Sequence, residues 1–327
     1  MIYIDPHSPH ILKAKKTHLD ELFPIIKERV NSLEEGDELK DFLNELRIKN
    51  IITDIPEFLE RHHNDLLRRL DNHSTDEWAE YVKIKKSNSK TPDQINLCEK
   101  YKKLVERIEK IFQYTGGFAK KKKKKYCAYS LAGALKAQTC VYCNRIYTKT
   151  VVKPKKSTRP EFDHWFPKEN YPILALSFYN LIPSCHICNS SVKGTTVMSL
   201  TDFIHPYVDD KINYKFSYWI EKYDKYNFKI IRITPSREDT TIKAFKLEEI
   251  YETHRDEIHD LVRIKKIYSV GYLLKMQKMI EKTGNKTSME ELYRLAFGVH
   301  YNESDFHKRP LSKMKKDIIE ELGLKLT

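Results

Sequence analysis

Apolar residues recur at helical spacing through the first third of the chain, between polar positions that would face solvent. The clearest set, which follows Thr17 and Asp20 as expected start signals, is Leu19, Leu22, Phe23, Ile26 and Val30. Ser74-Thr-Asp-Glu77 and Thr91-Pro92-Asp-Gln94 have the sequence of capping boxes, in which side chains satisfy the free N–H groups of a helix start. We therefore expect a helical region up to about residue 118.

The pattern changes after Gly116-Gly117. Residues 142–152, 160–165 and 181–182 contain the β-branched and aromatic side chains that are typical of strands. They predict short strands or a hairpin, followed after Cys188 by a helix or turn that carries Lys193.

The last part of the chain first alternates and then returns to helical spacing. Residues 215–220 and 228–233 predict two antiparallel strands, and apolar positions from Thr240 onward predict a helical arm that is interrupted near Gly271. A final amphipathic helix is expected over residues 312–322. The fold class is therefore α+β and mainly helical, with parts at residues 1–118, 119–200 and 201–327.

The net charge of the chain indicates which kind of partner it binds. The chain has 59 Lys and Arg against 46 Asp and Glu, a net charge of +13, which favours polyanions and most simply nucleic acid. Residues 120–159 contain thirteen basic and no acidic side chains, including six consecutive lysines at 120–125 that form either a flexible linker or a phosphate-binding strap. No apolar run is long enough to cross a membrane and the first residues lack a signal-peptide pattern, so we expect a cytoplasmic protein without membrane contact.

Two CxxC pairs predict a structural zinc site. The four thiols are Cys140, Cys143, Cys185 and Cys188. Two closely spaced pairs can surround one tetrahedral zinc ion, and four thiolates leave no open position for catalysis. Reduced thiols without metal are the alternative, and a redox role is a weaker one.

An Asp-His dipeptide between these pairs has the residue types that phosphodiester hydrolysis requires. A neutral His164 can accept a proton from water, and Asp163 can bind a hard divalent cation. Asn189, directly after Cys188, can supply a second oxygen ligand, and Asn180 can orient a loop or the histidine. Each residue alone has an ordinary structural interpretation, and the prediction rests on the combination.

These residues resemble the motif of HNH endonucleases of the ββα-metal type with an embedded four-cysteine zinc site. The resemblance covers about residues 138–195 and includes Asp163-His164-x-x-Pro167-Lys168, Asn180-Leu181, Cys185-x-x-Cys188-Asn189 and Lys193. It implies a central ββα-metal nuclease core, with His164 as general base and Asp163 and Asn189 as ligands of Mg²⁺ or Mn²⁺. Asn189 stands where many members have a histidine. Lys168 and Lys193 are candidate phosphate contacts.

A further resemblance rests on the Pro172-Ile-Leu-Ala-Leu-Ser-x-x-Asn180-Leu181 run, the His205-Pro-Tyr207 segment and the total layout. In these features the chain is similar to the HNH subunits of Septu-type and retron-associated antiphage systems, which work beside an ABC-type ATPase. This resemblance implies an effector nuclease in antiphage defence, with DNA as the favoured substrate and an ATPase as partner. Nothing in the motif separates DNA from RNA such as transfer RNA. A zinc-stabilised nucleic-acid-binding subunit without catalysis is a further alternative.

Overall fold

A computed structural model describes residues 1–326 apart from 122–124, 154–156, 195 and 224. The N-terminal part is helical, as predicted. Its helices are α1 (Pro9–Asn31), α2 (Glu38–Phe42), α3 (Glu45–Thr53), α4 (Pro56–Arg69), α5 (Thr75–Ile84) and α6 (Pro92–Ile111). Half of the lysine run at 120–125 lies outside the described residues, so the structure does not address its proposed role as a strap.

The predicted helix starts are confirmed where a side chain caps them. Ser74 accepts a hydrogen bond from the backbone of Glu77, and Thr91 forms a complete capping box with Gln94. The start of α1 is an exception, because the helix begins at Pro9 rather than near Thr17. Proline is favoured in the first turn of a helix, where its missing N–H costs nothing, so Pro9 is the start signal of α1.

The central part consists of short elements joined by long loops. They are η1 (Tyr114–Phe118), α7 (Ala128–Leu135), β1 (Val151–Val152), β2 (Ser157–Thr158), β3 (Glu161–His164), η2 (Pro172–Leu174), η3 (Phe178–Asn180), β4 (Leu181–Ser184) and η4 (Ile187–Lys193). Strands β3 and β4 pair antiparallel, with Asp163 opposite Ile182 and His164 opposite Leu181. The expected strand over residues 142–152 is reduced to β1 and a single bridge from Thr139 to Tyr147, because the chain there turns to form the first cysteine pair.

The C-terminal part begins with the predicted hairpin and continues with helices. It comprises β5 (Tyr214–Lys222), β6 (Lys225–Arg232), α8 (Arg237–Ala244), α9 (Leu247–Glu252), α10 (Arg255–Ile267), α11 (Val270–Glu281), α12 (Met289–Phe297), η5 (Glu303–Lys308) and α13 (Ser312–Glu321). The interruption of the helical arm lies between α10 and α11, just before Gly271.

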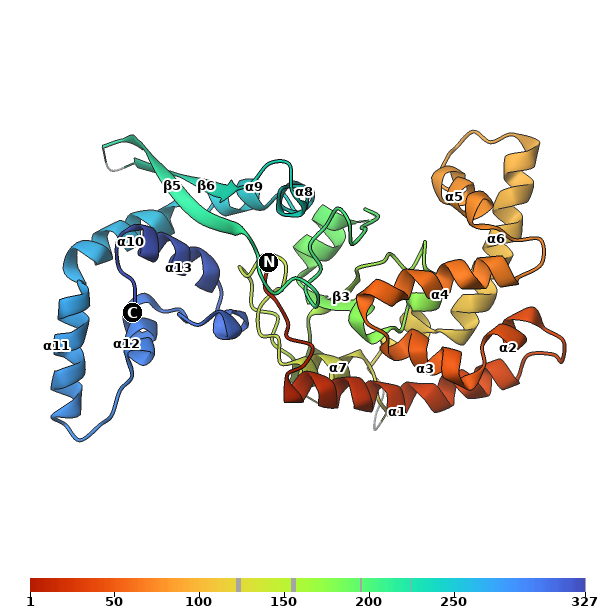
Figure 1. Cartoon of the computed structure of the whole chain (residues 1–327), viewed down its shortest axis with the longest axis horizontal. Helices are drawn as coiled ribbons and strands as arrows, with labels where there is room; N and C mark the ends of the chain where they lie inside the picture. Colours follow the sequence, from red (N-terminus) through yellow and green to blue (C-terminus); the bar gives the residue numbers. More distant parts are fainter. Residues whose placement is uncertain (122–124, 154–156, 195, 224, 327) are drawn as a thin grey trace.

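Figure 1 shows the N-terminal helices on one side of the molecule, the C-terminal elements on the other and the central loops between them. Buried apolar side chains from all three parts belong to one continuous cluster. The shape is therefore elongated around a shared core, and the central part is held from both sides. None of the described helices is both long enough and apolar enough to span a bilayer.

Two adjacent histidines, His62 and His63, are expected to diverge on a helix and to lie at the surface, because neighbouring side chains on a helix do not share a face. In α4 both are buried instead. His62 bonds the carboxylate of Asp54 at 2.7 Å, and His63 packs edge-on against the rings of Trp78 and Tyr171. Both faces of α4 are covered at this level, which adjacency in the sequence does not reveal.

Candidate functional site

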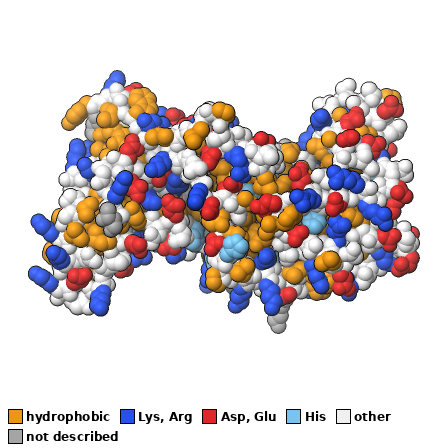
Figure 2. Space-filling view, viewed as in Figure 1, with side chains coloured by type: hydrophobic (Ala, Val, Ile, Leu, Met, Phe, Trp, Pro, Cys, Tyr) orange, Lys and Arg blue, Asp and Glu red, His pale blue; other side chains and the backbone are white. Residues whose placement is uncertain are grey.

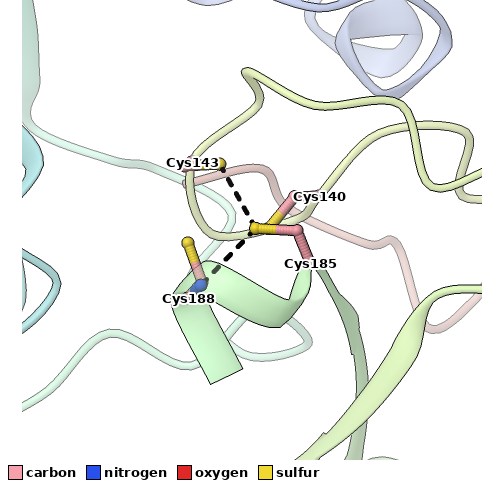
Figure 3. Close-up of side chains that lie close together, drawn as sticks. All are labelled: Cys140, Cys143, Cys185 and Cys188. Atoms are coloured by element: carbon pink, nitrogen blue, oxygen red, sulfur yellow. Dashed lines mark hydrogen bonds between the residues drawn. The ribbon is translucent and has the colours of Figure 1, made fainter. Parts of the chain in front are cut away.

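The four cysteines of the two CxxC pairs come together. Cys140 and Cys143 lie in the turn after α7, whereas Cys185 follows β4 and Cys188 lies in η4 (Figure 3). All four are buried, and their sulfur atoms lie within 4.8 Å of one another. A zinc ion with four Zn–S bonds of about 2.3 Å separates its sulfurs by about 3.8 Å. The 4.0 Å between the sulfurs of Cys143 and Cys185 is close to that spacing, so the cluster fits a structural zinc ion.

Backbone hydrogen bonds shape both cysteine turns. The N–H of Cys140 donates to the carbonyl of Ile146 at 3.0 Å, and the N–H of Cys188 points to the sulfur of Cys185 at 3.5 Å. The N–H of Val141 donates to the carbonyl of Pro183 and joins the two turns. Burial raises the pKa of the Cys140 thiol, and a bound cation would favour its thiolate form.

The predicted Asp-His site opens into a pocket of about 460 Å³ beside this cluster. Five of the six predicted side chains outside the cysteine cluster line it: Asp163, His164, Lys168, Asn189 and Lys193. The sixth, Asn180, is fully buried behind the pocket wall. The β3–β4–η4 segment thus gathers residues that are up to 30 positions apart in the chain.

His164 is held in one orientation by a backbone carbonyl. Its Nε2 lies 3.0 Å from the carbonyl oxygen of Ala175, which can only accept, so Nε2 carries the proton of the neutral ring. Nδ1 is then the unprotonated nitrogen, and within the described residues it has no hydrogen-bond partner. Burial lowers the pKa of His164 to about 3, and the imidazole is neutral at pH 7.

Asn180 positions the loop that holds the histidine. Its amide nitrogen donates to the carbonyls of Phe166 at 3.1 Å and Leu174 at 3.0 Å, and its oxygen accepts from the N–H of Phe166 at 2.7 Å. Ala175, the partner of His164, directly follows Leu174. Asn180 is therefore linked to the partner of His164 through the backbone, and the orienting role expected from the sequence stays a prediction.

Lys193 occupies a different place from the one expected for a phosphate contact. Its side chain is 1% exposed, and its ammonium donates to Oδ1 of Asp163 and to the carbonyl of His164, both at 2.9 Å. Tyr142 donates to the other oxygen of Asp163. Lys193 is thus a buried internal cation. Lys168 is only half-buried, and its ammonium reaches the hydroxyl of Thr115 at 3.4 Å, so it can meet an incoming anion.

Glu161 organises Asn189 and was missed in the sequence. Its carboxylate accepts from the amide nitrogen of Asn189 at 2.8 Å, from His186 at 2.9 Å and from Ser190 at 3.2 Å. Burial alone would raise the pKa of Glu161, but these hydrogen bonds outweigh it and lower the pKa. Glu161 lies two residues before Asp163 on one strand, so both side chains are on the same face. This spacing is the feature of the sequence that indicates Glu161.

Two further residues line the pocket, and one of them, Arg159, belongs to the basic segment 120–159. The ring of Tyr114 packs edge-on against His164 with centroids 4.4 Å apart, and burial raises the pKa of Tyr114 to about 12. Arg159 also lines the pocket, and among the described residues its buried Nε has no hydrogen-bond partner. Tyr114 lies 49 residues before Asp163 in the chain, whereas Arg159 lies four residues before it, just ahead of β3.

Two side chains of this pocket carry oxygen atoms of kinds that hard divalent cations bind. The carboxylate of Glu161 only accepts, so the amide nitrogen of Asn189 faces it and the amide oxygen remains without a partner in the described part of the chain. Asp163 contributes a carboxylate, but its Oδ1 accepts from the Lys193 ammonium and its Oδ2 accepts from the Tyr142 hydroxyl. Asp and Asn oxygens are ligands that Mg²⁺ and Mn²⁺ accept.

Comparison with known proteins gives distant and partial similarity. The chain is 37% identical over 76 residues to the Septu protein PtuB of Bacillus thuringiensis, which is 23% of this chain and 26% of that protein. It is 38% identical over 55 residues to protein ea31 of Escherichia phage lambda, which is 16% of this chain and 19% of that protein. The alignments thus span about a quarter and a fifth of these relatives. No protein-family model and no solved structure matches the chain.

Proposed function

We propose that this protein is a metal-dependent HNH endonuclease that hydrolyses phosphodiester bonds of DNA as the effector of a bacterial antiphage system. The observation that carries the proposal is the arrangement of His164, a neutral and oriented base, in one pocket with Asp163 and Asn189. The antiphage context rests on the partial similarity to the Septu protein PtuB. The β3–β4–η4 segment has the strand–strand–helix order of a ββα-metal core.

In this proposal, Nδ1 of His164 accepts a proton from the attacking water, and the Ala175 carbonyl stabilises the orientation and the charge of the resulting imidazolium. Asp163 and Asn189 would hold the divalent cation, which supplies electrostatic stabilisation of the charge that develops on the phosphate. Lys168 and Arg159, which lie in the same pocket, would bind the phosphate oxygens.

The test is a cleavage assay with the purified, zinc-loaded chain. Supercoiled plasmid, single-stranded DNA and RNA are each incubated with Mg²⁺ or Mn²⁺, beside His164→Ala and a His7→Ala control, since His7 is an exposed histidine far from the pocket in sequence. We expect His164→Ala to abolish cleavage with unchanged zinc content and His7→Ala to cut normally. Undiminished cutting by His164→Ala would refute the assignment. Preferential cutting of RNA would redirect the substrate, and binding without cleavage by the unaltered chain would favour a non-catalytic subunit.

We also propose a partner subunit, an ABC-type ATPase, for this nuclease. The similarity to a component of the Septu system supports a partner in general terms, and the chain itself has no GxxxxGK[ST] phosphate-binding loop. Purification of the tagged protein from its native host, followed by mass spectrometry, is expected to recover an ATPase in near-equal amounts. Recovery of the chain alone under gentle lysis would contradict the partnership.

A further inference from the structure

The β5–β6 hairpin has one face that packs on the protein and an opposite face that is only partly covered. On the opposite face Ser217 and Asn227 are buried, and Ser217 donates to the carboxylate of Glu321 in α13 at 2.9 Å. Cross-strand pairs Phe216–Ile230 and Tyr218–Phe228 belong to the packed face. There, the rings of Phe216 and Phe228 lie 4.5 Å and 5.3 Å from the ring of Tyr251 in α9. Side chains alternate between the two faces along a strand, so these residues share one face. Their packing against Tyr251 anchors the ribbon through that face.

The opposite face carries an exposed tryptophan among lysines. Trp219 lies opposite Asn227, Ser217 lies opposite Lys229, and beyond the register shift near Glu221 Lys222 lies opposite Lys225. The alternation of strand side chains therefore places Trp219 on the same face as its basic neighbours. They are Lys215, Lys222, Lys225 and Lys229, all exposed. Figure 2 shows apolar and basic side chains side by side over the hairpin, at the upper left.

These lysines are available to a partner. Within the part of the chain that the structure describes, none of the four forms an ion pair. The nearby carboxylate of Glu221 accepts from Asn227 instead. From Lys211 to Arg232 the sequence has six basic and two acidic residues. Trp219 is 47% exposed, whereas the other two tryptophans, Trp78 and Trp165, are 6% and 0% exposed. The fold does not require the indole of Trp219 to be half exposed to solvent.

We propose that this face of the β5–β6 ribbon binds a single-stranded segment of nucleic acid, with a base stacked on Trp219 and phosphates on the flanking lysines. An aromatic platform combined with a row of cations matches unpaired nucleic acid, whose bases and backbone are both accessible. Protein interfaces are depleted in lysine, which argues against a protein as the occupant of this face. The site is separate from the Asp163 pocket and extends beyond the proposed hydrolysis, because binding requires no cleavage.

Intrinsic fluorescence tests the proposal directly, because Trp219 is the exposed one of three tryptophans. A thymidine oligonucleotide of about 16 nucleotides is titrated into zinc-loaded His164→Ala protein, so that cleavage cannot interfere. We expect stacking to quench the emission and Trp219→Phe to remove that quenching while retaining part of the affinity. Trp219→Ala should weaken binding by about tenfold, in line with about 1–3 kcal/mol for one stacked base.

A charge-matched pair of triple variants tests the lysines. Lys222→Gln, Lys225→Gln and Lys229→Gln together should reduce the slope of log affinity against log salt by about 2, at about 0.7 per phosphate contact. The control changes three exposed lysines of α6, Lys102, Lys103 and Lys110, to Gln. Equal losses in both triple variants, or a duplex of the same length that binds better than the single strand, would overturn the proposal. So would unchanged emission at saturating oligonucleotide. The nuclease assignment would stand in each of these cases, since it is judged by cleavage.

Discussion

Replacement of Lys193 by methionine tests whether this lysine is a structural cation or a phosphate contact. Lys193 and Asp163 have side chains that are 1% and 4% exposed, and their ion pair is 2.9 Å long. Methionine keeps the length of the lysine side chain but removes its charge. The carboxylate of Asp163 would then be buried with only the hydroxyl of Tyr142 and no cation. Breaking a buried pair in this way typically costs about 3–5 kcal/mol of unfolding free energy.

The loss of unfolding free energy caused by Lys193→Met should depend on the charge of Asp163. In the double variant Lys193→Met/Asp163→Asn the uncompensated charge is absent, so we expect its loss of stability to be about 2 kcal/mol smaller than the sum of the two single losses. Urea unfolding of zinc-loaded protein, followed by circular dichroism, gives the free energies from the midpoint and slope. Lys168→Met is the matched control, because Lys168 lies in the same pocket but is half-buried and, among the described residues, makes only one long hydrogen bond, to Thr115.

The control variant should unfold within about 0.5 kcal/mol of the unaltered protein while it loses affinity for nucleic acid. If Lys193→Met were as stable as Lys168→Met and showed the same reduced salt dependence of binding, the buried-pair argument would be refuted. Lys193 would then be the phosphate contact that the sequence predicts. Additive losses in the double variant would likewise mean that the charge of Lys193 does not compensate Asp163.

Three further predictions address the supports of the site. Asn180→Asp replaces an amide donor by a carboxylate that faces the carbonyls of Phe166 and Leu174, and we expect a loss of about 2–4 kcal/mol in urea unfolding together with impaired cleavage; a loss below about 1 kcal/mol would show that the loop does not need the amide. Burial lowers the pKa of His63 to about 3, below the value of about 6.5 in the unfolded chain, so the unfolded state takes up the proton first and stability falls as pH drops below about 6.5. His63→Phe should flatten this decline by up to about 1.4 kcal/mol per pH unit, and an unchanged pH profile of the melting temperature would contradict the buried neutral ring. Cys188→Ser, or treatment with a strong zinc chelator, should reduce zinc from about one ion per chain to almost none by elemental analysis and lower the melting temperature, whereas full zinc retention would exclude the four-thiolate site.

The sequence predicts the parts of this fold that depend on local patterns. Capping side chains marked α5 and α6, and alternation marked the β5–β6 hairpin. The strand expected over residues 142–152 does not form over its full length. The chain turns around Cys143, and Tyr147 forms a single bridge with Thr139. Strand propensity describes a half-buried pleated surface and does not determine whether a partner strand lies alongside.

The candidate site also contains some features that the sequence predicts and others that it does not. Spacing alone grouped the four cysteines, and the Asp-His dipeptide marked a pocket that does contain Asn189. The burial of Lys193 could not be predicted, because its partner lies 30 residues away and a lysine near a proposed phosphate site is usually exposed. Tyr114 reaches His164 from a different part of the chain, and only the tertiary packing brings the two rings together.

The short segment η4 connects the two candidate sites physically. Cys188 contributes its sulfur to the cluster, Asn189 follows it directly and is held by Glu161, and Lys193 at the end of the segment reaches Asp163. A zinc ion bound by the four thiolates would therefore fix the backbone from which both the amide and the ammonium extend toward the pocket. The coupling also runs in the other direction, because the Lys193–Asp163 pair ties the far end of η4 to β3. Zinc and the buried ion pair thus hold opposite ends of one segment, so loss of either is expected to misplace Asn189.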